Sequence, residues 1–102
     1  MIRHIVLVKF KTETSENEIK SIFTELDHVR SEINGMSAVH SGRSESPEHI
    51  ERGFMHGFTV DFDSWQGLRA YQNHPSHQAT GAKIVSSAEG GIDGILVFDF
   101  EF

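Results

Sequence analysis

The sequence predicts one α+β domain over residues 1–102, and three observations support this prediction. The length suits a single core, because a chain of this size buries roughly two-thirds of the surface that it exposes when unfolded. Apolar residues alternate with a period of two in some segments and recur at helical spacing in others. These segments follow one another as strand, helix, strand, and then as strand, helix, helix, strand.

The first half of the chain opens with a strand over residues 2–10, whose even-numbered positions share one face. Ser15 then begins a helix as a capping box, because its hydroxyl can accept from the amide of Glu18 while that carboxylate reaches back. Asn34-Gly35 ends this helix. The polar segment from residue 36 to about residue 44 predicts a weak strand at a sheet edge.

The second half repeats the pattern with one more helix. Residues 54–62 alternate clearly and predict a strand. Ser64 can cap a short helix, and Pro75 fits the first turn of the next one. Gly90-Gly91 breaks that helix, and residues 92–102 predict the last strand.

This element order is the split βαβ pattern of ferredoxin-like folds, with a four-stranded antiparallel sheet and helices on one face. In that topology we expect the even-numbered positions of the first, third and fourth strands to meet the helices. The opposite face would then carry an apolar patch of Ile5, Leu7, Met55, Ile95 and Val97. Because such a patch usually marks an interface, we predict a symmetric homodimer in which two sheets stack face to face.

The charge balance excludes several classes of partner. Nine basic residues against fifteen acidic ones give a formal net charge of −6, so we expect no nucleic acid and no anionic membrane surface as partner. No apolar run approaches the length of a transmembrane helix. The chain has no cysteine, which removes disulfides and thiol chemistry and leads us to expect a cytoplasmic location.

Two histidines interrupt the apolar stripes of the strands. His4 and His56 are each the only polar side chain on a face that we expect to meet the helices, so they either form internal hydrogen bonds or line a cavity. Pro75 at a helix start places His77 in the first turn, facing the sheet. Tyr71 ends the preceding helix and can aim at the same region. The sequence therefore predicts one pocket that collects these four side chains.

Three chemistries fit such a cluster. The first is acid–base catalysis without a cofactor, in which imidazole transfers a proton and the phenol polarises a carbonyl. The second is a metal site, since His74 and His77 have i, i+3 spacing, although Pro75 makes His74 a capping residue. The third is a small-molecule pocket in which the same groups only bind.

Four segments together resemble the stress-responsive dimeric α/β-barrel (Dabb) family over nearly the whole chain. They are the opening strand from His4 to Phe10, the stretch Gly53 to His56, the Tyr-x-x-His-Pro-x-His segment from Tyr71 to His77, and the closing strand from Asp93 to Phe100. The third is the most specific. The resemblance implies a ferredoxin-like protomer and a barrel formed by two sheets across a dimer interface.

One branch of this family contains plant polyketide cyclases of the olivetolic acid type, which need no cofactor. By this resemblance His77 would be the catalytic base and Tyr71 would hold the carbonyl as enolate charge develops. His4 and His56 would orient those groups or the substrate, and His74 would be a further substrate contact. The substrate would be a β-keto or phenolic compound.

Some relatives in the family hold a divalent cation on backbone carbonyls after the first helix, which implies Arg30, Ile33 and Met36 here. The resemblance leaves two main functions open. One is a stress-response protein that binds a small molecule without turnover, and the other is a cofactor-independent cyclase or lyase. A monooxygenase or haem-linked enzyme is a third interpretation that rests on the fold alone.

Overall fold

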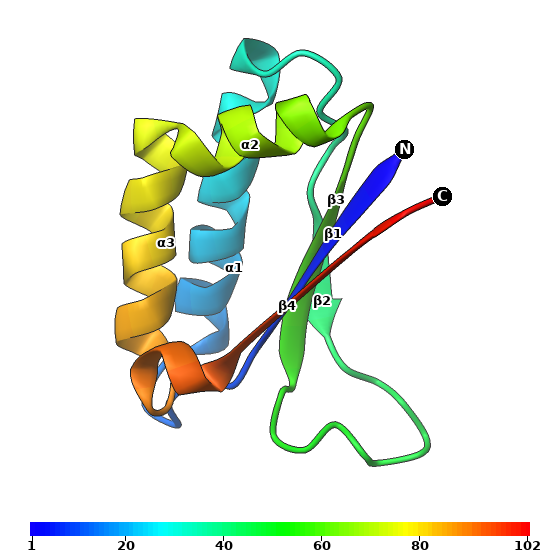
Figure 1. Ribbon diagram of the computed structural model, residues 1–102. Helices are drawn as coiled ribbons and strands as arrows, with labels where there is room; N and C mark the ends of the chain where they lie inside the picture. The colour runs from blue at the N-terminus through cyan, green and yellow to red at the C-terminus, as the bar shows by residue number, and fades with distance from the viewer.

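The computed structural model describes residues 1–102 and arranges them as one sheet covered by a layer of helices (Figure 1). The strands are β1 (Ile2–Val8), β2 (His40–Arg43), β3 (His56–Phe62) and β4 (Ile95–Glu101). The α-helices are α1 (Glu16–Leu26), α2 (Trp65–Asn73) and α3 (Pro75–Ser87), and two 3₁₀ helices are η1 (Asp27–Glu32) and η2 (Gly91–Gly94). None of these helices combines the length and apolar character that crossing a bilayer requires.

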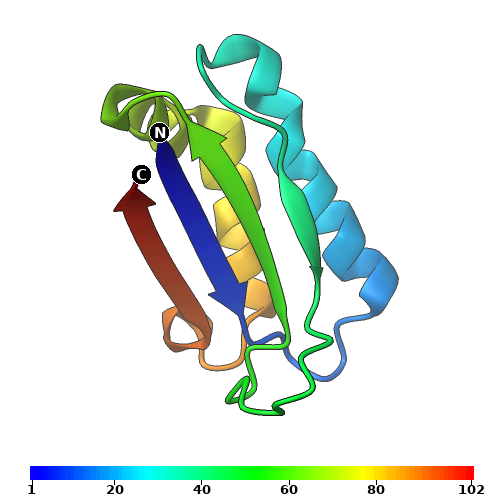
Figure 2. The ribbon, with the colours of Figure 1, turned by 90° about the vertical axis from the view of Figure 1, so that its right-hand side faces the viewer.

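The sheet has the strand order β2-β3-β1-β4, and all neighbouring strands are antiparallel. The helices lie on one face only, and Figure 2 looks onto the other face, which no element of the chain covers. This architecture confirms the ferredoxin-like α+β fold predicted from the element order. The two central strands, β1 and β3, each pair with two neighbours and supply the sheet's part of the core.

Alternation in β1 and β3 builds the core as predicted. The even-numbered residues of both strands are buried against the helices, and the odd-numbered residues face the open side. Ile2, Val8 and Phe62 are among the most deeply buried side chains. His4 and His56 belong to these stripes and are 3% and 7% exposed, which confirms that both imidazoles lie under the helix layer.

The helix caps follow the sequence closely, with one change at each end of the first helix. Ser15 Oγ accepts from the Glu18 amide at 3.1 Å, but the Glu18 carboxylate meets the Ser15 hydroxyl at 3.3 Å instead of a backbone amide. The α-helix ends at Leu26, and the chain continues as the tighter η1, so the single helix predicted up to Asn34 is two elements. Asp27 accepts from the Val39 amide at 2.9 Å and ties this junction to the chain that leads into β2.

The strand bounds are shorter than the apolar pattern indicates. β1 stops at Val8, and Phe10 retains only an isolated bridge to Ala88. β4 begins at Ile95, because Gly90 and Gly91 adopt left-handed backbone angles and lead into η2.

The phase predicted for the last strand is wrong. Cross-strand pairing sets Val97 opposite Val6 and Ile95 opposite Val8, so the odd-numbered residues of β4 are on the helix side of the sheet. Ile95 and Val97 therefore do not belong to the open face. Apolar residues occupy both phases of this strand, so the sequence alone does not fix which phase faces the helices.

The open face is nevertheless apolar, with β4 supplying other side chains than those predicted. Leu7 is 38% exposed, Leu96 is 50% exposed and Phe98 is 63% exposed. At one end of this face Arg3 donates two hydrogen bonds to the Asp61 carboxylate, at 2.9 and 3.0 Å. This ion pair holds the pKa of Asp61 below its usual range.

Candidate functional site

The break between α2 and α3 brings Tyr71 and His77 together at one end of the sheet. His74 is the C-cap of α2 and the N-cap of α3, where its Nδ1 accepts from the Ser76 amide at 3.1 Å. Pro75 follows as the first residue of α3 and cannot continue α2. The chain turns at this point, and the rings of Tyr71 and His77 lie with their centroids 4.1 Å apart.

Both side chains carry a buried polar atom without a hydrogen-bond partner. Tyr71 is fully buried, and neither its hydroxyl nor His77 Nδ1 has a partner within the structure. A buried polar group normally finds a partner, because leaving one unpaired costs about 1–3 kcal/mol. Two such atoms lie on adjacent rings, so both are free to bond a group from outside the chain.

Burial also sets the protonation state of this pair. It lowers the pKa of His77 to about 4, with the neighbouring His4 and His74 adding to the effect, and it raises the pKa of Tyr71. At neutral pH the imidazole is therefore unprotonated and the phenol keeps its proton. The uncharged imidazole can accept a proton and the neutral phenol can donate a hydrogen bond, with His77 a weaker base than a free imidazole.

His4 joins this pair from β1. Its ring centroid lies 6.0 Å from that of Tyr71 in an edge-on arrangement, and its Nδ1 lies 2.6 Å from a carboxylate oxygen of Asp99 on β4. A carboxylate only accepts, so Nδ1 of His4 carries the proton and the ring orientation is fixed.

Asp99 is a site residue that the sequence did not predict, because the even-numbered phase of the last strand was expected under the helices. Asp99 pairs with His4 across β1 and β4, and both side chains are on the helix side of the sheet. The signal that could have revealed it is a lone aspartate between Phe98 and Phe100. A charged residue inside an apolar strand needs a partner, and a buried histidine on the neighbouring strand provides one.

The structure does not bring His56 to this cluster. His56 pairs with Val8, four residues along β1 from His4, which corresponds to about 13 Å. Its Nε2 lies 3.0 Å from both carboxylate oxygens of Glu16 at the start of α1, and Arg43 Nη1 donates to the same carboxylate at 3.0 Å. These contacts hold the pKa of Glu16 below its usual range. His56 therefore belongs to a second polar cluster at the opposite end of the sheet.

His74 lies near the pair but turns away from it. Its Nδ1 caps α3, and its Nε2 lies 3.4 Å from the Glu32 carboxylate. His74, three residues before His77, thus stabilises the helix junction. No group of three or more histidine, cysteine, aspartate or glutamate side chains is placed to hold a metal ion.

The carbonyls implied as cation ligands lie at the end of η1. Arg30 O accepts from the Ile33 amide and Ile33 O accepts from the Met36 amide, each at 3.4 Å. Each of these two carbonyls thus accepts one long bond from the chain's own amides, and the Arg30 guanidinium lies 3.7 Å from the Asp27 carboxylate. A cation at these three carbonyls stays a prediction of the family resemblance.

Gly81 leaves open space on α3 where another residue would carry a side chain. A Cβ built at Gly81, one turn after His77, would meet no atom within 4 Å, whereas Ile84 and Ala88 further along the same stripe are buried. A hollow of about 550 Å³ lies elsewhere, on the open face of the sheet.

The fold and the site define a class of protein: ferredoxin-like α+β protomers with a histidine and a tyrosine between the sheet and the helix pair. The family model for the Stress responsive A/B Barrel Domain (Dabb) matches residues 2–102, and the chain belongs to this family.

Individual relatives agree with this assignment. A stress-response A/B barrel domain-containing protein of Arabidopsis thaliana is 31% identical over 99 residues, which cover 96% of this chain and 83% of that protein. Olivetolic acid cyclase of Cannabis sativa is 27% identical over 99 residues, covering 97% and 94% of the two chains. A dimeric ferredoxin-like protein of unknown function from Jannaschia sp. CCS1 superposes with a TM-score of 0.91 at 31% identity, covering 99% and 98%.

Proposed function

We propose that this protein binds a small carbonyl or phenolic compound at Tyr71 and His77 and transfers protons on it, in chemistry that needs no cofactor. The observation that carries the proposal is the pair of buried, unpartnered atoms, Tyr71 Oη and His77 Nδ1. At neutral pH the phenol can donate a hydrogen bond, and the neutral imidazole accepts one at Nδ1 in the tautomer that carries its proton on Nε2. A carbonyl oxygen and an acidic C–H group next to it are complementary to that pair.

The proposed reaction begins with proton abstraction. His77 Nδ1 takes the proton from the carbon beside the carbonyl, and the electrons of that C–H bond form an enolate, to which Tyr71 donates a hydrogen bond. The enolate carbon then attacks a second carbonyl of the same molecule, which forms a C–C bond and leaves an alkoxide. The protonated His77 returns its proton to that alkoxide, so the base is regenerated.

His4 acts in this scheme as a positioning residue. Asp99 fixes its orientation at 2.6 Å, and its ring packs edge-on against Tyr71, so it holds the phenol in place. The similarity of this chain to olivetolic acid cyclase, a named cyclase, supports this chemistry for the present protein.

Binding without turnover is the second candidate, and one observation favours it. Both unpartnered atoms are enclosed in the structure, and Tyr71 also packs against Phe62 at a centroid distance of 5.2 Å. So closed a site limits the movement of a bound molecule, which favours binding over turnover.

We also propose that the protein acts as a homodimer through the open face of the sheet. Exposed apolar side chains such as Leu96 and Phe98 favour burial of this face. Several solved structures with the same fold are described as dimeric, including those from Jannaschia sp. CCS1 and Thermobifida fusca.

Turnover of activated β-diketones by wild type, His77→Ala and Tyr71→Phe tests the proposed function. We expect both variants to lose activity, by about 10²-fold or more for the loss of the base. Equal rates in all three proteins would remove the catalytic claim. If none of the three turns over the substrate but only wild type binds it, the second candidate is correct.

A further inference from the structure

A buried histidine and an exposed arginine hold one carboxylate between them, at the end of the sheet opposite the Tyr71–His77 pair. His56 Nε2 lies 3.0 Å from each carboxylate oxygen of Glu16, and Arg43 Nη1 donates to one of these oxygens at 3.0 Å. A carboxylate only accepts, so Nε2 of His56 carries the proton. The histidine and the arginine therefore form a place that suits a carboxylate, and Glu16 occupies it.

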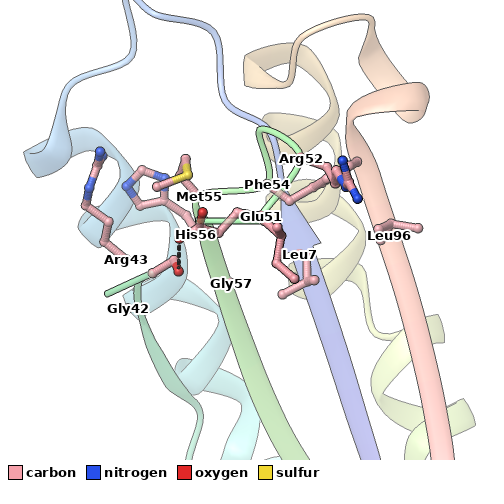
Figure 3. Close-up of a pocket in the computed structure, with 12 residues that line it drawn as sticks. Leu7, Gly42, Arg43, Glu51, Arg52, Phe54, Met55, His56, Gly57 and Leu96 are labelled. Atoms are coloured by element: carbon pink, nitrogen blue, oxygen red, sulfur yellow. Dashed lines mark hydrogen bonds between the residues drawn. The ribbon is translucent and has the colours of Figure 1, made fainter. Parts of the chain in front are cut away.

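The sheet sets the two partners of this carboxylate in place. Arg43 pairs with His56 across β2 and β3, and Figure 3 shows their side chains next to each other, on the opposite side of the view from Leu96. Residues that pair across two strands share one face of the sheet, so Arg43 is on the helix side with His56. The cluster is therefore away from the open face, which we propose as the dimer interface.

Glu16 is the movable member of the cluster. Its side chain is 63% exposed and that of Arg43 is 55% exposed, whereas the His56 side chain is 8% exposed. Exposed ion pairs contribute little to stability, because water screens them and both long side chains lose freedom when they pair. The Glu16 carboxylate can therefore turn out into solvent, while the imidazole stays fixed under the helix layer.

Two hollows of about 300 Å³ and about 220 Å³ meet at this cluster. The larger one lies between α1 and β2, and the smaller one is lined by the chain that connects β1 to α1. Four residues line both hollows, namely Glu16, Ile19, Arg43 and His56. When the Glu16 side chain turns outward, the space that it leaves joins the two hollows beside the imidazole.

The surroundings favour an anion that has an apolar body. Ile19 and Phe23 are buried and supply apolar surface to the larger hollow. Lys20 lines the same hollow, is exposed and has no ion pair. With the Glu16 carboxylate turned away, Arg43 and Lys20 are two cations without a counter-charge, which attracts a negatively charged molecule.

We propose that this cluster is a second binding site, which takes a small carboxylate with a flat apolar body, and that Glu16 is its internal competitor. The ligand carboxylate replaces that of Glu16 against His56 and Arg43. The apolar body lies against Ile19 and Phe23 in the larger hollow. The site is independent of the proton chemistry proposed above, because it lies at the other end of the sheet.

Titration of the purified protein with benzoate at neutral pH, followed by the NMR signals of the His56 imidazole, tests the proposal. We expect weak binding to wild type and about tenfold tighter binding to Glu16→Ala, because no internal carboxylate competes in the variant. Adding Arg43→Gln to Glu16→Ala should weaken binding about tenfold, since it removes a charge-assisted contact. Benzamide, which has a similar shape without the charge, should bind more weakly than benzoate by a similar factor.

Two control variants separate competition by Glu16 from a general change of charge. Glu18→Ala removes another carboxylate from the first turn of α1, and Glu18 lines neither hollow. Arg69→Gln removes an exposed arginine on α2 that lines neither hollow. Each variant should bind benzoate as weakly as wild type does.

Three outcomes would overturn the proposal. The first is that Glu16→Ala binds benzoate no more tightly than Glu18→Ala does. The second is that Arg43→Gln leaves the affinity of Glu16→Ala unchanged. The third is that benzoate shifts the NMR signals of His77 and not those of His56, because the ligand would then bind at the other end of the sheet.

Discussion

Removing the Tyr71 hydroxyl should stabilise the protein while it abolishes function. The hydroxyl is fully buried and has no partner, so Tyr71→Phe deletes a desolvated polar group and breaks no hydrogen bond. The phenyl ring keeps its packing against Phe62, His4 and His77. A change of this kind in a native core normally destabilises, so the expected sign is itself informative.

The magnitude follows from the cost of leaving a buried hydroxyl unpaired, which is about 1–3 kcal/mol. We therefore expect Tyr71→Phe to raise the free energy of unfolding by about 1 kcal/mol or more. For a domain of this size, each kcal/mol moves the melting temperature by roughly 4–8 °C. Urea denaturation and thermal melting at one fixed protein concentration measure this, since dimerisation makes both depend on concentration.

Thr80→Val is the matched control, because it removes a buried hydroxyl that has partners. Thr80 is 4% exposed, and its Oγ1 lies 3.1 Å from the Glu25 carboxylate and from the Ser76 carbonyl. This variant should lose about 1 kcal/mol. If Tyr71→Phe destabilises the protein as Thr80→Val does, the phenol has a partner in the free protein, and the reasoning that reserves it for a ligand is wrong.

Three further predictions concern the base, its neighbour and the interface. Burial lowers the pKa of His77 to about 4 from an ordinary 6.5, so the unfolded chain binds more protons than the folded one between these values. The free energy of unfolding should therefore rise with pH across this window. The rise should be smaller in His77→Ala, which urea midpoints measured at several pH values would show. Asp99→Asn should weaken the contact to His4, reducing stability by about 1–2 kcal/mol in urea and turnover in β-diketone assays. Phe98→Glu should give an 11.5 kDa monomer in light scattering, whereas Ile92→Glu, similarly exposed but away from the sheet, should remain dimeric.

Each of these predictions has an outcome that contradicts it. An unchanged pH profile in His77→Ala would mean that another group titrates in the window. Glu101→Gln changes an exposed carboxylate on the helix side of β4, so equal losses in this variant and in Asp99→Asn would argue against a special role for the His4 contact. A dimeric Phe98→Glu would move the interface away from the open face.

The sequence predicted the fold well because alternation in β3 has only one interpretation. Its even-numbered residues are apolar apart from His56 and its odd-numbered residues are Gly57, Thr59 and Asp61, so one face is clearly the buried one. β4 has apolar residues in both phases. Its orientation comes from hydrogen-bond register with β1, which is a long-range property that local sequence does not carry.

The candidate site was likewise predicted only where local sequence determines the geometry. Tyr71 and His77 could be brought together from sequence because Pro75 fixes the local turn between them. The distance of His56 from the other three side chains could not be predicted. A residue on the helix-facing side of a strand can lie at either end of that strand. Its carboxylate partner Glu16 comes from the first turn of α1, where the sequence explains an acidic residue by the helix dipole alone.

His74 caps the end of one helix and the start of the next, so the spacing of the tyrosine and histidine rings is determined within the seven residues from Tyr71 to His77. The sheet contributes enclosure and the orientation of His4, but it does not determine that spacing. A helical hairpin of another protein that received these seven residues would inherit the ring pair as a unit. The part of the site that would not transfer is the low pKa of His77, because burial under the rest of the protein is its main cause.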